Sequence, residues 1–233
     1  MALTTDAPPE PPAKAKRRRG PAYWIGLGML LAGLAVLGWL AWQFWGTTWE
    51  AHRDQRKNVQ LFERGSRLTD AEALIRIPRF GKKYVVPVYA GVSEDVLARG
   101  FGHFPHTADP GQVGNYALAG HRITHGQPLR DMPELRPGDK VIVETHRATY
   151  TYVLDTNPND LVVSFTQTWV LDKHPHNPTP GGVEPAARYH RLITLTTCSE
   201  LFHTDNRMIA FGHLVGTKKH PRHGPRPLPT TVG

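Results

Sequence analysis

A run of 25 residues without a charged side chain, Pro21 to Trp45, is the strongest constraint on how this chain can fold. As a helix, the segment would be about 37 Å long at 1.5 Å per residue. That length exceeds the roughly 30 Å hydrocarbon thickness of a bilayer. Tyr23 and Trp24 near one end, and Trp42 and Trp45 at the other, supply the aromatic rings that favour membrane interfaces. We therefore expect residues 21–45 to form a transmembrane helix.

The residues that flank this helix predict its orientation. Residues 1–20 are rich in Pro and Ala and carry five basic side chains between Lys14 and Arg19, just before the apolar run. Positive charge next to a span favours the cytoplasmic side, which predicts a disordered cytoplasmic tail over 1–20. A cleaved signal peptide would need a shorter apolar region and a small-residue cleavage site. The Trp-rich segment that follows here is a poor cleavage site. We expect a single-pass protein of the cell membrane, with its larger part outside.

The charge pattern of the remaining chain argues against one class of partner. The formal net charge is +8, and a basic balance can serve nucleic acids, anionic lipids or cell-wall polymers. Beyond the N-terminal tail, however, the sequence has neither a long basic run in its folded part nor basic residues alternating with aromatic ones. We therefore predict no binding of nucleic acid.

The composition beyond the anchor is typical of an all-β domain. Residues 46–72 are polar, lack Pro and predict a helical stalk. From 73 to 217, short segments rich in Val, Ile, Leu, Thr and Tyr alternate with Gly, Pro, Asn and Asp clusters, which predicts a barrel or sandwich with little helix. The Pro-rich tail 218–233 is expected to be disordered. The predicted strands are Ala73–Ile77, Tyr84–Tyr89, Asn115–Gly120, Lys140–Glu144, Thr149–Asp155, Leu161–Ser164, Thr168–Leu171, Arg191–Thr197 and Arg207–Val215, with short helices at Val92–Arg99 and Asp131–Leu135.

The only cysteine, Cys198, ends the predicted strand Arg191–Thr197. A side chain at a strand end is held by the sheet and exposed at the loop, a position that suits a nucleophile. Thiolate is the reactive form and needs a nearby cation. A single thiol excludes a disulfide within the chain, although free cysteines often serve as small buried hydrophobes. Both interpretations stay open on composition alone.

Two further residues complete a candidate catalytic group. Arg207 begins the next predicted strand, and an antiparallel return would bring its guanidinium beside Cys198, where it can stabilise a thiolate or bind a peptide carbonyl. His121 ends the strand Asn115–Gly120 and can exchange protons during acyl transfer. The sequence shows no clear third residue to orient the imidazole, although Asp155, Asp205 and Asn206 stay open as candidates. It also lacks a metal-binding motif, so we predict no metal and no cofactor.

These segments resemble the sortase family of cysteine transpeptidases. Thr-Leu-Thr-Thr-Cys, ending at Cys198 and followed by Arg207, is similar to the sortase signature, and Asn-Tyr-Ala-Leu-Ala-Gly-His-Arg around His121 is similar to the sortase histidine segment. The continuation through Leu-Arg-Pro-Gly-Asp, ending at Asp139, resembles class E sortases in particular. The resemblance covers about residues 73–216.

The resemblance implies an eight-stranded β-barrel that cleaves a Leu-Ala-x-Thr-Gly or Leu-Pro-x-Thr-Gly sorting signal of surface proteins between Thr and Gly. Cys198 would carry the thioacyl intermediate, His121 would act as general acid and then base, and Arg207 would bind the signal's backbone. The acceptor would be an amine of lipid II or peptidoglycan. Tyr116 lies where class E members carry a tyrosine linked to the Leu-Ala preference; the alternative is a strand aromatic that packs in the core. Thr197 and Ser199 are further candidates for substrate contact.

Some features depart from the class E pattern or lack a role. Ser199-Glu200 follows the cysteine where class E members usually have His-Pro, and Leu171–Arg188 is irregular. Two other functions remain open: a hydrolytic cysteine peptidase that uses water as the acceptor, and a non-catalytic module that binds cell-wall polymer.

Overall fold

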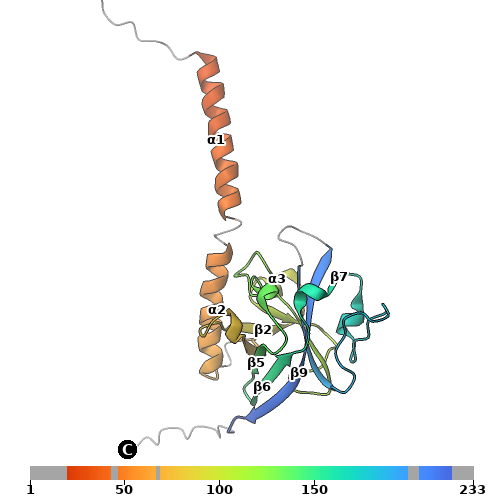
Figure 1. The fold of residues 1–233 in the computed structure, drawn as a ribbon. Coiled ribbons are helices and arrows are strands. Elements are labelled where there is room, and N and C mark those ends of the chain that lie inside the picture. The colour runs from red at the N-terminus through yellow and green to blue at the C-terminus, as the bar shows by residue number, and fades with distance from the viewer. Residues whose placement is uncertain (1–19, 43–46, 67–68, 199–204, 222–233) are drawn as a thin grey trace, which may run out of the picture. The chain divides into compact units, whose positions relative to one another are not determined.

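The computed structural model describes residues 20–42, 47–66, 69–198 and 205–221 (Figure 1). The chain forms two compact units, Met1–Trp42 and Gln43–Gly233. In the first unit, helix α1 spans Pro21–Ala41 and begins with a proline, whose missing N–H is no loss in the first turn. Its Pro21–Trp39 part is long and apolar enough to cross a membrane, and none of it is buried within the protein.

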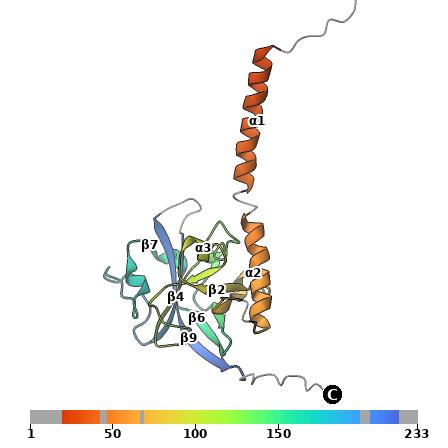
Figure 2. The ribbon, with the colours of Figure 1, turned by 180° about the vertical axis from the view of Figure 1, so that it is seen from behind.

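The second unit is a closed β-barrel (Figure 2). Eight strands follow each other in the order β6-β5-β1-β2-β3-β4-β8-β9, and pairing between β6 and β9 closes the ring, while β7 is an extra strand on β9. The pairs β2–β3 and β4–β8 are parallel and the others are antiparallel. The predicted eight-stranded barrel is thus confirmed. The strands are β1 Ala73–Arg76, β2 Val86–Ala90, β3 Phe101–His103, β4 Gly114–Ala119, β5 Lys140–Glu144, β6 Ala148–Leu154, β7 Val162–Ser164, β8 Arg191–Cys198 and β9 Asn206–Lys219.

The barrel core follows from the alternation of side chains along these strands. In β4, Tyr116 and Leu118 are buried in the core, and in the neighbouring β8 Ile193 and Leu195 join them. Successive strand residues point to opposite faces, so the intervening positions face outward. There, Asn115 Nδ2 donates to the Val170 carbonyl (3.0 Å), and the Thr194 hydroxyl donates to Asn115 Oδ1 (2.7 Å). This buried polar chain joins β4, β8 and the segment that covers them.

That covering segment corrects one strand prediction. Thr168–Leu171 is a 3-10 helix, η5, rather than a strand. Its apolar residues Trp169 and Val170 pack onto the outer face of β9 near Ile209 and Phe211. A second error is the missed strand β3, which is only three residues long. The other short helices are α3 Glu94–Leu97, η2 Pro78–Phe80, η3 Met132–Glu134 and η4 Pro158–Asp160.

Helix α2, Thr47–Glu63, belongs to the same compact unit as the barrel and lies along its side (Figures 1 and 2). Its buried residues recur at the three- and four-residue spacing of one helical face; they are Ala51, Gln55, Val59 and Phe62. Val59 and Phe62 pack with Leu74 of β1 and Tyr89 of β2. Helix α2, which lies in the predicted 46–72 stalk, therefore packs against the barrel through hydrophobic side chains.

Candidate active site

Strands β8 and β9 bring Cys198 and Arg207 together in register. Cys198 is the last residue of β8 and pairs directly with Arg207, the second residue of β9. Arg207 is half-buried, and its Nη1 atom donates to the carbonyl of Asn206 at 3.1 Å. Ser199 and the rest of the connecting loop, 199–204, lie outside the described residues. The backbone therefore returns antiparallel and places Arg207 opposite Cys198, as the sequence predicts.

Strands β4 and β8 bring His121 to the same end of the barrel. The two strands run parallel, with Ala119 opposite Thr196. The Gly120 N–H donates to the Thr196 carbonyl (3.1 Å), and the Thr197 hydroxyl donates to the Gly120 carbonyl (2.7 Å). His121 follows Gly120 and Cys198 follows Thr197, so each of these two residues is next in sequence to one partner of the Thr197–Gly120 hydrogen bond. Three neighbouring strand ends therefore carry the three predicted catalytic residues.

The His121 side chain is half-buried beside two groups that we did not predict as site residues. Its Nε2 atom lies 3.3 Å from Oε1 of Glu94, in the first turn of α3. The His125 ring lies 5.2 Å from the His121 ring, with the two planes tilted by 32°. The four-residue separation of the histidines was visible in the sequence. The Glu94 contact was not, because it depends on how α3 packs next to β3.

The loop that follows His121 has an unusual backbone. His125, Gly126 and Gln127 all have positive φ angles, at 51°, 79° and 51°, and two of the three are not glycine. Such left-handed conformations are uncommon for residues with a Cβ. The Leu129 N–H donates to the His121 carbonyl (3.0 Å) and closes the loop at its base.

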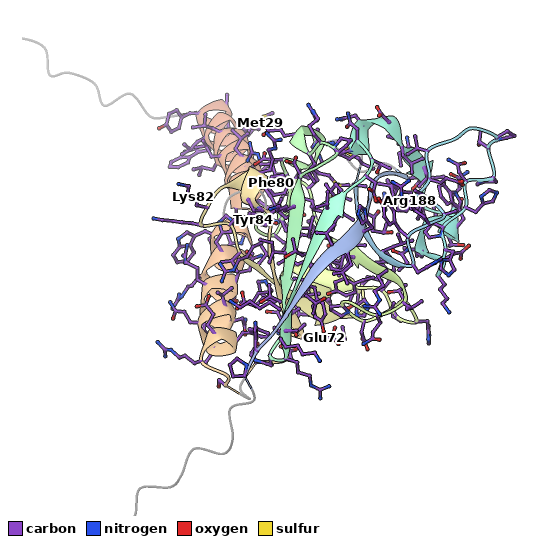
Figure 3. The ribbon with its side chains drawn as sticks, turned by 60° about the horizontal axis from the view of Figure 1, so that its bottom comes forward. Met29, Glu72, Phe80, Lys82, Tyr84 and Arg188 are labelled. Atoms are coloured by element: carbon purple, nitrogen blue, oxygen red, sulfur yellow. The ribbon has the colours of Figure 1, made fainter. Side chains whose placement is uncertain are left out.

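Neighbouring elements hold this loop in place. Figure 3 labels Tyr84, whose hydroxyl donates to the Pro128 carbonyl at 2.6 Å. Burial raises the pKa of Tyr84 well above its ordinary value, so this hydroxyl stays a donor at physiological pH. From helix α2, His52 Nε2 lies 3.1 Å from the Gly126 carbonyl oxygen. The segment after His121 therefore contacts both helix α2 and the loop before β2.

The proposed substrate contacts have different surroundings. Tyr116 is 1% exposed and lies in the barrel core. Its ring lies 4.7 Å from that of His103 in an edge-to-face arrangement, and burial raises its pKa well above the ordinary value. Thr197 is 3% exposed, and its hydroxyl is already engaged with Gly120. Substrate contact by Tyr116, Thr197 or Ser199 stays a prediction.

Comparison with known proteins agrees with this geometry. A family model described as the sortase domain matches residues 75–215. Sortase SrtE1 of Streptomyces coelicolor is 34% identical over 224 residues, which cover 87% of this chain and 59% of that protein. The chain thus spans less than two thirds of the length of this relative.

Solved structures of class E sortases have the same fold. Sortase E from Streptomyces avermitilis is 38% identical, with a TM-score of 0.55 over 64% of this chain and 91% of that one. The sortase E1 structure from Streptomyces coelicolor, which holds a tripeptide in its active site, is 34% identical with a TM-score of 0.54 and the same two coverages. The family match covers more than half of the chain and coincides with the barrel and its three strand ends. The chain belongs to the sortase family.

Proposed function

We propose that the protein is a membrane-anchored cysteine transpeptidase. Its substrates are surface proteins with a Leu-Ala-x-Thr-Gly or Leu-Pro-x-Thr-Gly sorting signal, and its acceptor is an amine of lipid II or peptidoglycan. The observation that carries the proposal is the meeting of Cys198, His121 and Arg207 at three adjacent strand ends. The sortase match and the tripeptide in the active site of sortase E1 from Streptomyces coelicolor support it.

The proposed reaction proceeds in two acyl transfers. The Cys198 thiolate attacks the threonine carbonyl of the signal, and the threonine–glycine C–N bond breaks as His121 protonates the leaving amine. The resulting thioester is then attacked by the acceptor amine. His121 takes the proton from that amine, and the thiolate leaves. Arg207 binds the signal's backbone and stabilises negative charge on the carbonyl oxygen.

The decisive experiment compares the purified full-length protein with its Cys198→Ala variant in detergent. A Leu-Ala-x-Thr-Gly peptide is supplied with and without an amine acceptor, and mass spectrometry identifies the products. Transpeptidation predicts the aminolysis product with the wild type and no turnover with Cys198→Ala. Wild-type turnover by Cys198→Ala would refute the mechanism, whereas a hydrolysis product alone, with the amine present, would favour a peptidase.

A non-catalytic cell-wall-binding module makes a different prediction. It would show no covalent labelling of Cys198 by a thiol-reactive peptide mimic of the signal, and its binding to wall polymer would fall steeply with salt. The proposed enzyme should instead be labelled at Cys198 and lose its turnover on labelling.

The proposed topology places the N-terminus in the cytoplasm and the barrel outside, with α1 as a single-pass anchor. The apolar length of α1 and the basic residues before it support this orientation. Cys198 is the only thiol, so a membrane-impermeant maleimide applied to intact cells reports on one position. Labelling without cell lysis is the expected result, and labelling only after lysis would refute the orientation.

A further inference from the structure

Three side chains with metal-binding atoms lie close together, and the proposed catalytic histidine is one of them. Glu94, His121 and His125 each offer one ligand atom, and these atoms all lie within 4.8 Å of one another. In the described part of the chain, this is the only group of three or more such residues with that spacing. The residues come from two separate segments, the first turn of α3 and the loop after β4, so the fold and not sequence proximity brings the carboxylate to the histidines.

The spacing of the first pair already suits a tetrahedral cation. Zinc binds imidazole nitrogens at about 2.0–2.1 Å and carboxylate oxygens at about 2.0–2.2 Å. Two ligand atoms at these distances lie roughly 3.4 Å apart in tetrahedral geometry. Nε2 of His121 and Oε1 of Glu94 are 3.3 Å apart. Glu94 has a side chain that is 74% exposed, so its carboxylate is free of packing that would prevent small adjustments.

The third ligand, His125, has a conformation that needs an explanation. Its Nδ1 atom is buried and has no hydrogen-bond partner among the described residues, although buried polar atoms normally have one. Its φ of 51° lies in the left-handed region, followed by positive φ at Gly126 and Gln127. Strained backbone clusters at binding and switching sites. A coordinated cation is one group that would give this imidazole a polar partner.

We propose that Glu94, His121 and His125 form a Zn²⁺ site and that the bound cation reversibly inhibits the enzyme. The inhibitory part rests on the proposed transpeptidase function. Two histidines and one glutamate are a known zinc ligand set that leaves the fourth position to water. A metal-bound imidazole is neutral and uses a ring lone pair on the cation. His121 in that state cannot deliver a proton to the leaving amine, so the metal and catalysis compete for the same residue.

The ligand types also set the selectivity of the site. Imidazole suits Zn²⁺ and its transition-metal neighbours, whereas Mg²⁺ and Ca²⁺ prefer sites built from oxygen ligands. We therefore expect inhibition by Zn²⁺ and Co²⁺, reversal by a chelator, and no inhibition by Mg²⁺ or Ca²⁺ at the same free concentration.

The activity test uses the full chain and compares each variant with its own zinc-free rate. His125→Ala and Glu94→Gln should each raise the half-inhibitory concentration of buffered Zn²⁺ by about tenfold or more, the lower end of the loss seen when metal sites lose a supporting group. His176→Ala is the matched control, because His176 and Glu184 form another histidine–carboxylate pair, at 2.8 Å, outside this cluster. Its half-inhibitory concentration should not change.

A binding test separates this proposal from the proposed function. Zn²⁺ affinity is measured on Cys198→Ala by competition with a chromophoric chelator, so no turnover is needed. Cys198→Ala should bind one Zn²⁺, and adding His125→Ala should weaken binding by at least about tenfold. Equal Zn²⁺ affinity with and without His125→Ala would overturn the site, even if transpeptidation is confirmed. Inhibition that persists unchanged in both His125→Ala and Glu94→Gln would also overturn it, because the metal would then act through the thiol alone.

Discussion

The hydrogen bond from the Thr197 hydroxyl to the Gly120 carbonyl offers a direct test of how the barrel aligns the proposed catalytic residues. The bond is 2.7 Å long and buried, and its two residues immediately precede Cys198 and His121. Thr197→Val keeps the shape of the side chain but removes the donor. The Gly120 carbonyl is then left in a buried position without this partner.

The expected cost follows from that loss. A buried acceptor without its donor costs about 1–3 kcal/mol in the free energy of unfolding. For a domain of this size, each kcal/mol lowers the melting temperature by about 2–4 °C. A loss of about 2 kcal/mol therefore corresponds to a drop of about 4–8 °C. Misplacement of reacting groups by about 1 Å can reduce a rate roughly 100-fold, so we expect kcat/KM to fall by about tenfold or more.

The assay pairs thermal unfolding with peptide aminolysis, and Thr197→Ser is the matched control. Serine retains the hydroxyl, so it should retain most of the activity that Thr197→Val loses. A Thr197→Val protein with the wild-type melting temperature and kcat/KM would refute the role of the bond. A lower melting temperature with unchanged kcat/KM would show that the bond stabilises the barrel without aligning the site.

Two further predictions concern the barrel itself. Gly212→Ala should destabilise the barrel by about 2 kcal/mol, because an added Cβ would lie 2.5 Å from a carbonyl oxygen of β6. Gly216→Ala is the control, since its added Cβ meets nothing closer than 4.0 Å. Equal melting temperatures for the two variants would contradict this expectation. Burial alone would raise the pKa of Asp139, but hydrogen bonds from the Arg79 guanidinium and the Arg136 amide hold that pKa below its ordinary value. A depressed folded-state pKa means stability that is present above about pH 4 and lost as the pH falls through the folded value. Asp139→Asn should therefore lose less stability than the wild type between about pH 5 and pH 2 in urea unfolding, and identical pH profiles would contradict the reasoning.

Most of the barrel was predictable because its strands carry local signals. The segment Arg191–Thr197 is rich in β-branched residues, and the structure has a strand there that extends to Cys198. The three-residue β3 was missed because Phe-Gly-His carries no alternating pattern. The Thr, Trp and Val residues of η5 favour strands and therefore predict a strand where the structure has a 3-10 helix. The apolar residues Trp169 and Val170 instead pack in a cluster with Phe211, a contact between distant parts of the chain.

The site was predictable in its residue types and less so in its surroundings. The positions of Cys198 and His121 at strand ends followed from where the apolar segments stop. The involvement of Glu94 did not, because it depends on the packing of α3 beside the loop after β4. The contact of α2 with that loop, through His52 and Gly126, joins residues 74 positions apart. Contacts between residues so far apart cannot be predicted from local sequence patterns.

The double pairing of β9 has a consequence for how the barrel is completed during synthesis. This strand pairs with β8 along Arg207–His213 and with β6 along Gly212–Lys219, and it is the last strand among the described residues. A nascent polypeptide that lacks it leaves β6 and β8 as open sheet edges, which are prone to pair with other chains. It also lacks Arg207. If Arg207 acts as proposed, truncated or stalled chains are therefore inactive as well as prone to aggregate, and the proposed site is complete only when β9 has been made.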